Sequence, residues 1–153
     1  MTDGLGCVLI RWAVTTLRRG AWAPVLVFSI HVIGAAVFHV YRRIPDFDVP
    51  MHFFGGVAIA YFFGAAYRAG LESKLLGEPS RVVFPLVVIG WTCLAAVIWE
   101  FSEFISDATW KTHTQPSLDD TMLDLLMGLL GGGAYLLCSM CRQKSQIADA
   151  HGS

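Results

Sequence analysis

The residues best suited to chemistry are one histidine and several carboxylates in three short segments of the chain. Each segment lies at an end of a long apolar run. The members are Asp48 and His52 in the first segment, Glu100, Glu103 and Asp107 in the second, and Asp119, Asp120 and Asp124 in the third. Carboxylates and imidazole bind divalent cations such as Mg²⁺, Mn²⁺, Zn²⁺ or Fe²⁺, and a carboxylate can also act as a general base.

The spacing within the second and third segments aligns their carboxylates on helix faces. Positions 100, 103 and 107 are related by i, i+3 and i+7, and positions 120 and 124 by i and i+4. Residues at these spacings share one face of an α-helix. Asp124 lies inside an apolar run, and an aspartate near the centre of a bilayer costs roughly 2.5–3.5 kcal/mol on insertion scales. We therefore expect Asp124 to face the interior of a helix bundle and to meet a partner there.

The three segments would meet at one depth if the apolar runs pack antiparallel. So many carboxylates in a partly dry site cannot all stay charged without a cation. We therefore expect a divalent metal held by His52, Glu100, Asp120 and Asp124. Glu103 and Glu100 are the candidate catalytic carboxylates, and Glu103 is the preferred general base because it is one turn nearer to water. The remaining acids of the polar set are Asp48, Asp107 and Asp119.

Two arginines and a second histidine near the same end extend this hypothesis. Arg42 and Arg43 could bind the phosphate of a substrate. His39 is a candidate additional ligand or proton carrier.

Structural roles are the alternative for each residue taken singly. Glu100 and Glu103 could instead form ion pairs with Arg42, Arg43 and Lys111. Asp119 and Asp120 could cap a helix, and so could Asp48, because Pro50 fits the first turn of a helix beginning there. His52 could be a packed histidine at the membrane interface.

Four apolar runs must position these side chains: residues 23–41, 51–67, 82–99 and 122–140. About 20 apolar residues cross a bilayer as a helix. We therefore predict an all-α, multi-pass transmembrane bundle of four spans, preceded by an amphipathic or short extra helix around residues 5–17. The predicted parts are an interfacial segment 1–22, a membrane domain 23–141 and a polar tail 142–153.

The composition excludes several other classes of protein. Of the 153 residues, 55% are hydrophobic and only 15% are charged, and the mean hydropathy is +0.56. A soluble domain usually has about 25% charged residues. These values exclude a disordered chain, a nucleic-acid-binding protein and a soluble enzyme with an ordinary polar surface. Membrane lipid is the expected partner, and a homo-oligomer is left open.

The positive charges predict the orientation, because short cytoplasmic loops are enriched in Lys and Arg. Eight of these residues fall on one side of a four-span chain and three on the other. The eight are Arg11, Arg18, Arg19, Arg68, Lys74, Arg81, Arg142 and Lys144, and the three are Arg42, Arg43 and Lys111. Both termini are therefore expected in the cytoplasm, with the polar site facing outward.

The three polar segments resemble those of a known family. His52-Phe53 followed by Gly56, Trp99-Glu100-x-x-Glu103 and Asp120-Thr121-x-x-Asp124 resemble, in order and spacing, the YjdF-like family of small bacterial inner-membrane proteins, and more distantly the VanZ-like membrane proteins. The resemblance extends over about residues 48–133. It implies a multi-pass inner-membrane protein that shares the polar set, and the VanZ-like link points to the cell envelope. It implies no particular reaction.

Two functional hypotheses follow from the sequence. The first is a metal-dependent membrane hydrolase or transferase that acts on a lipid or lipid-linked envelope precursor, with one glutamate as the base. The second is a non-enzymatic membrane protein, namely a small carrier, a proton or cation pathway, or an envelope accessory protein. His31 is the only mid-span candidate that could continue such a pathway.

Overall fold

In the computed structural model, residues 4–78 and 80–151 are described, with side chains described up to Arg142 except that of Pro45. The predicted cytoplasmic Lys144 therefore lies outside the described side chains. Every regular element in the described part of the chain is helical, as predicted. The elements are α1 (Leu5–Gly20), α2 (Trp22–Ile33), the π-helical turn η1 (Gly34–Phe38), α3 (Val40–Arg43), the 3-10 turn η2 (Pro45–Phe47), α4 (Asp48–Glu72), α5 (Val83–Trp110) and α6 (Leu118–His151).

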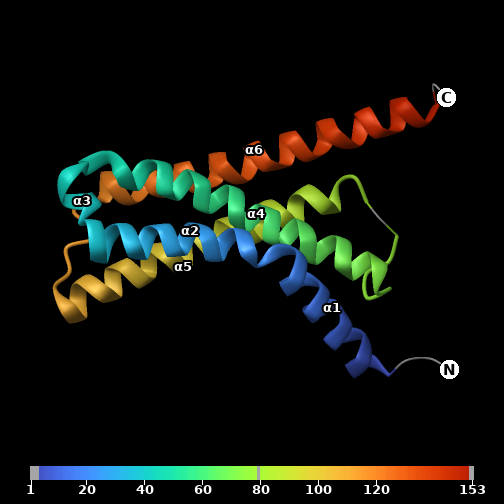
Figure 1. Cartoon of the computed structure of the whole chain (residues 1–153), viewed down its shortest axis with the longest axis horizontal. Coiled ribbons are helices and arrows are strands. Elements are labelled where there is room, and N and C mark those ends of the chain that lie inside the picture. The colour runs from blue at the N-terminus through green and yellow to red at the C-terminus, as the bar shows by residue number, and fades with distance from the viewer. Residues whose placement is uncertain (1–3, 79, 152–153) are drawn as a thin grey trace.

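Three of these helices are long and apolar enough to cross a membrane: Asp48–Glu72, Val83–Trp110 and Leu118–Arg142. A fourth candidate span is a pair of segments, Leu5–Gly20 and Trp22–Phe38, which meet at a bend of 52°. The connection between α4 and α5 lies at one end of the bundle, together with both ends of the described chain, and the α5–α6 loop lies at the other (Figure 1). The chain is a multi-pass membrane bundle.

The first apolar run does not form the continuous helix that its composition suggests. The α-helix ends at Ile33, the π-helical turn follows, and His39 has a left-handed backbone with φ 50°. The chain then turns through α3 and η2 into α4. This turn places Tyr41 and the beginning of α4 beside the end of α2, which a straight helix through residue 41 would not do.

Helix α4 is the central element, since it packs against α1, α2, α5 and α6. Its contact with α6 is close because glycines face one another. A Cβ atom at Gly56 would collide with the backbone of Gly128, and one at Gly131 would collide with the backbone of Phe53. Small residues allow such close helix packing in lipid. The close approach brings the polar beginnings of α4 and α6 together.

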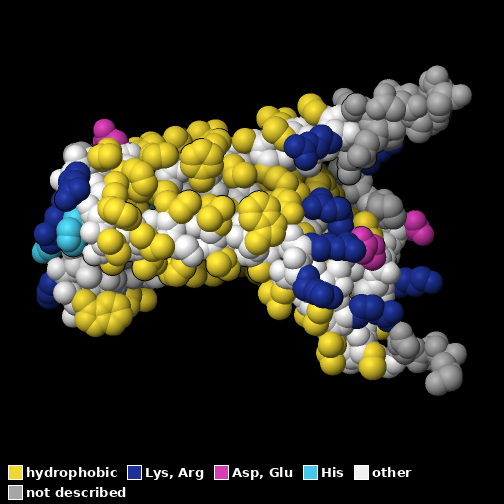
Figure 2. Space-filling model, in the orientation of Figure 1, with side chains coloured by type: hydrophobic (Ala, Val, Ile, Leu, Met, Phe, Trp, Pro, Cys, Tyr) yellow, Lys and Arg dark blue, Asp and Glu magenta, His cyan; other side chains and the backbone are white. Residues whose placement is uncertain are grey.

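The outer surface carries most of the large hydrophobic side chains, and the interior carries mostly small ones. The buried core cluster consists of Ala60, Val88 and Leu136. Hydrophobic side chains cover the middle of the visible face of the bundle, while Lys and Arg gather mainly at the end that carries the α4–α5 connection (Figure 2). This distribution suits a bundle surrounded by lipid, because burying apolar surface gains no hydrophobic free energy there.

Candidate metal centre

His52 is the centre of the polar cluster and lies one helical turn into α4. Its Nε2 atom is 3.4 Å from Asp48 Oδ1 and 3.7 Å from Asp124 Oδ2, and its Nδ1 atom is 3.9 Å from Glu100 Oε1. These residues come from α4, α5 and α6, so the three predicted segments meet as expected. Asp48 does not cap α4. It lies at the first helical position, and its carboxylate faces His52.

Two carboxylate oxygens in this cluster are buried without a hydrogen-bond donor among the described residues. They are Glu100 Oε1 and Asp124 Oδ2. The exposed fractions of the two residues are only 6% and 1%. A buried, unsatisfied carboxylate oxygen is costly, and a bound cation would remove that cost. Both oxygens lie within 4 Å of His52 nitrogens, where a metal ion could bind.

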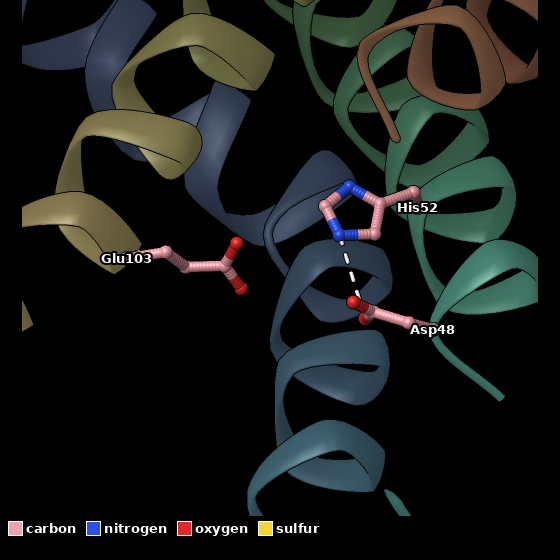
Figure 3. A group of neighbouring side chains, drawn as sticks. All are labelled: Asp48, His52 and Glu103. Atoms are coloured by element: carbon pink, nitrogen blue, oxygen red, sulfur yellow. Dashed lines mark ion pairs between the residues drawn. The ribbon is translucent and has the colours of Figure 1, made fainter. Parts of the chain in front are cut away.

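Glu103 approaches the cluster from α5, one turn beyond Glu100. Its carboxylate points toward Asp48 and His52 (Figure 3). Trp99 Nε1 donates a hydrogen bond to Glu103 Oε1 at 3.0 Å, which fixes that oxygen and leaves the second one available. Glu103 can therefore serve as a ligand or as a base held beside the ion.

Three overlapping groups of side chains have ligand atoms close enough to share a metal ion, within 4.8 Å of one another in each group. The groups are His52, Glu100 and Asp124, then Asp48, His52 and Glu103, and then Asp48, Asp120 and Asp124. All four predicted metal ligands occur in these groups, and Asp48 and Glu103 join them. A His/carboxylate donor set of this kind fits a hard or borderline divalent cation.

Other predicted site residues lie outside the cluster. Asp107 Oδ1 and Oδ2 accept hydrogen bonds from the backbone N–H groups of Thr114 and Gln115, so this carboxylate organises the α5–α6 loop. Asp119 is exposed and belongs to none of the three groups. His39 is exposed at the left-handed turn.

The alternative network of ion pairs is absent from the described residues. Neither Glu100 nor Glu103 lies within ion-pair distance of a lysine or arginine there. Arg42 and Arg43 are exposed on α3, and Lys111 Nζ donates to the carbonyl of Ala108. The buried acids thus have histidine as their only positively chargeable partner among the described side chains.

Several supporting residues were not singled out from the sequence as members of the site. Gln115 Nε2 donates a hydrogen bond to Glu100 Oε2 at 3.0 Å, and no sequence signal marks this loop residue. Trp99 lies four residues before Glu103, a spacing that could have revealed its contact. His31 Nδ1 and the Tyr41 hydroxyl are hydrogen-bonded across the turn at residues 34–39, which the sequence did not predict.

Tyr41 lies outside the membrane-spanning segments. Burial, and next the carboxylate of Asp48, raise the pKa of its phenol, so the hydroxyl keeps its proton and can donate.

Comparison with known proteins identifies a family of membrane proteins. The family described as predicted membrane protein (DUF2238) matches residues 5–145. An uncharacterised protein of Thermotoga maritima is 33% identical over 103 residues, which make up 67% of this chain and 52% of the relative. The chain thus spans about half the length of that curated relative. No solved structure matches the chain.

Proposed function

The chain belongs to the DUF2238 family of predicted membrane proteins, and from this premise we propose that it is a divalent-metal-dependent membrane hydrolase or transferase. Its substrate is a lipid or a lipid-linked precursor of the cell envelope. The observation that carries the proposal is the pair of buried, unsatisfied oxygens of Glu100 and Asp124 on either side of the His52 ring. Buried acids inside membrane proteins usually serve a function, because they are expensive to insert.

The chain's own residues supply what the chemistry requires. His52, Glu100, Asp120 and Asp124 would hold the cation, with Asp48 beside them. A bound divalent ion would activate a water molecule and polarise the substrate group. Glu103 is placed to accept a proton at this position, since its carboxylate faces the cluster and one of its oxygens is held by Trp99. Gln115 orients Glu100 through its amide.

The interior of the bundle favours an enzyme over a carrier or a proton or cation pathway. Beyond His52, the core cluster consists of Ala60, Val88 and Leu136, and the other buried apolar residues of the described chain are alanines and Tyr67. The hydroxyl of Thr92 is occupied by the carbonyl of Val88. A pathway across the membrane would need polar groups at this depth.

The cellular setting is part of the proposal. We place the protein in the bacterial inner membrane, with cytoplasmic termini and an outward-facing centre. The excess of Lys and Arg at the end that carries the α4–α5 connection supports this orientation. The likeness of the polar segments to those of YjdF-like and VanZ-like proteins agrees with an envelope role, and membrane lipid is the proposed partner.

Metal content tests the proposal directly. The protein, purified in detergent and loaded with Mn²⁺ or Zn²⁺, should retain at least one equivalent of metal after desalting. The double variant Glu100→Gln/Asp124→Asn should lose it, because both unsatisfied oxygens are changed. Asp119→Asn is the matched control, since it removes an exposed acid outside the cluster. Absence of retained metal in the wild-type protein would overturn the metal centre.

A second comparison separates the base from the ligands. Glu103→Gln should keep most of the metal and lose metal-dependent turnover of a bacterial lipid extract, followed by mass spectrometry. Loss of a general base typically reduces the rate about 10²–10⁴-fold. Unchanged turnover in this variant would remove Glu103 from the mechanism.

A further inference from the structure

A cavity of about 420 Å³ lies directly beside the candidate metal centre. Its walls come from α2, α4, α5 and α6 and are almost entirely apolar. They include Val25 and Phe28 of α2, Met51 and Ile59 of α4, and Ala96 and Trp99 of α5. Asp48 and His52, which belong to the metal centre, also line it. The cavity is therefore an apolar chamber with a charged end.

The cavity opens sideways, toward the hydrocarbon of the bilayer. Val25 and Phe28 line it and are nevertheless 60% and 53% exposed, so its wall reaches the outer surface. Helices α2 and α5 touch through side chains near the polar end of the cavity, where Phe28 and His31 each contact Trp99. Both helices pack on α4, which forms the floor. Acyl or isoprenoid chains surround this opening in a membrane.

We propose that the cavity binds one hydrocarbon chain of a membrane amphiphile, which enters between α2 and α5 and brings the phosphate joined to that chain to the His52 centre. The catalytic half of this inference rests on the proposed function above. A chain in the apolar chamber leaves the group attached to its end beside Asp48 and His52, where a bound cation would coordinate anionic oxygen. The exposed Arg42 and Arg43 follow Tyr41, which is hydrogen-bonded to His31 of the cavity wall, and they add positive charge near this end.

The size and lining of the cavity suit a single chain. Ligand pockets commonly measure about 300–1,000 Å³ and are lined by apolar side chains with a few polar groups. A chain that enters the cavity leaves other hydrocarbon, so this transfer contributes little free energy and the polar end must supply the selectivity. Phospholipids and isoprenyl phosphates share the required chemistry, namely a phosphate at the end of a hydrocarbon chain or close to it.

A glycine in the cavity wall allows the proposal to be tested without touching the metal ligands. Gly55 lines the cavity, and a Cβ atom built there meets no other atom within 4 Å. The leucine side chain of Gly55→Leu would therefore extend into the cavity and occupy part of it. Gly90 of α5 is equally free of contacts, is exposed and does not line the cavity, so Gly90→Leu is the matched control.

The experiment uses two probes with a photoactivatable diazirine in the chain: a phosphatidylglycerol and a long-chain isoprenyl phosphate. Each is mixed into phosphatidylcholine nanodiscs with the full chain, and cross-linked peptides are mapped by mass spectrometry. Cross-links to residues 24–31 and 95–99 by one or both probes are expected in the wild type and in Gly90→Leu. In Gly55→Leu they should fall severalfold, because the leucine side chain would occupy the space that the hydrocarbon chain fills. The responding probe identifies the class of chain.

Cross-links that are confined to outward-facing residues, or that do not change in Gly55→Leu, would overturn the inference. If Gly55→Leu does not fold, Ala95→Leu fills the same cavity from α5 and gives the same comparison. Metal content is measured on the same samples. Cavity cross-links without metal would contradict the proposed function alone, and metal without cavity cross-links would contradict this inference alone.

Discussion

At the scale of single residues, the centre depends on groups that hold the ligands as well as on the ligands themselves. Glu100 receives a hydrogen bond from the Gln115 amide on one oxygen, and its other oxygen faces His52. Glu103 is held in the same way by Trp99. Partners that orient metal ligands commonly matter almost as much as the ligands, because an ion tolerates little misplacement of its donors.

Gln115→Ala should therefore weaken metal binding about 10–100-fold without abolishing it. The dissociation constant for Mn²⁺ or Zn²⁺, measured by competition with a chelator, is the appropriate quantity. Thr114→Ala is the loop control, because Thr114 contacts Asp107 and not the cluster. Equal affinities for the two variants would show that Gln115 does not orient Glu100.

At the scale of the elements, the site depends on how closely α4 and α6 approach. His52 is on α4 and Asp124 is on α6, and Gly56, Gly128 and Gly131 bring the two helices together one to two turns away. A β-carbon at Gly56 or Gly131 would force the helices apart, and the His52 to Asp124 distance would grow with them. These three glycines thus control both the packing of α4 against α6 and the geometry of the site.

Gly56→Ala should destabilise the bundle by about 1–3 kcal/mol, the usual cost of overpacking. It should also lower metal retention. Gly133→Ala lies on α6 with no atom within 4 Å of its Cβ, so it should be neutral or stabilising by up to about 1 kcal/mol through helix propensity. Thermal unfolding in detergent compares the two. A Gly56→Ala protein as stable as Gly133→Ala would refute the close contact.

At the scale of the whole molecule, charge is separated along the bundle. The cluster of acids lies at the beginnings of α4 and α6 and near the end of α5, close to the α5–α6 loop. Most described Lys and Arg side chains lie at the opposite end, where Figure 2 shows them gathered. An ion pair between Arg19 and Glu72, at 2.7 Å, joins α1 to α4 at that opposite end. Because Lys and Arg favour the cytoplasmic side, the cluster should face outward.

Cysteine labelling tests this orientation. The native cysteines Cys7, Cys93, Cys138 and Cys141 are all exposed and are first replaced by serine. Single cysteines at positions 46 and 111 should then react with an impermeant maleimide added outside intact cells. A cysteine at position 74, in the α4–α5 connection, is the control and should react only after the cells are opened. The reverse pattern would overturn the predicted orientation.

Part of the site was predictable because helix periodicity is local. Glu100, Glu103, Asp120 and Asp124 share helix faces by spacing alone, and Asp124 must face the interior because lipid excludes it. The contribution of Asp48 was less clear, since the same position suits a helix cap. The sequence also did not indicate that Asp107 lies outside the cluster. Its partners Thr114 and Gln115 belong to a loop, and a loop has no periodic pattern that would predict its path.

The sequence by itself determined the class of the protein, the rough positions of the three long helices of the bundle, and the faces that carry the acids. Those properties follow from hydropathy and helical periodicity, which act over short stretches of chain. Only the tertiary structure decided that the first apolar run breaks at residues 34–39, that His52 lies between Asp48, Glu100 and Asp124, and that an apolar cavity adjoins them. These features depend on the close approach of glycine backbones and on contacts between distant helices, which no local pattern encodes.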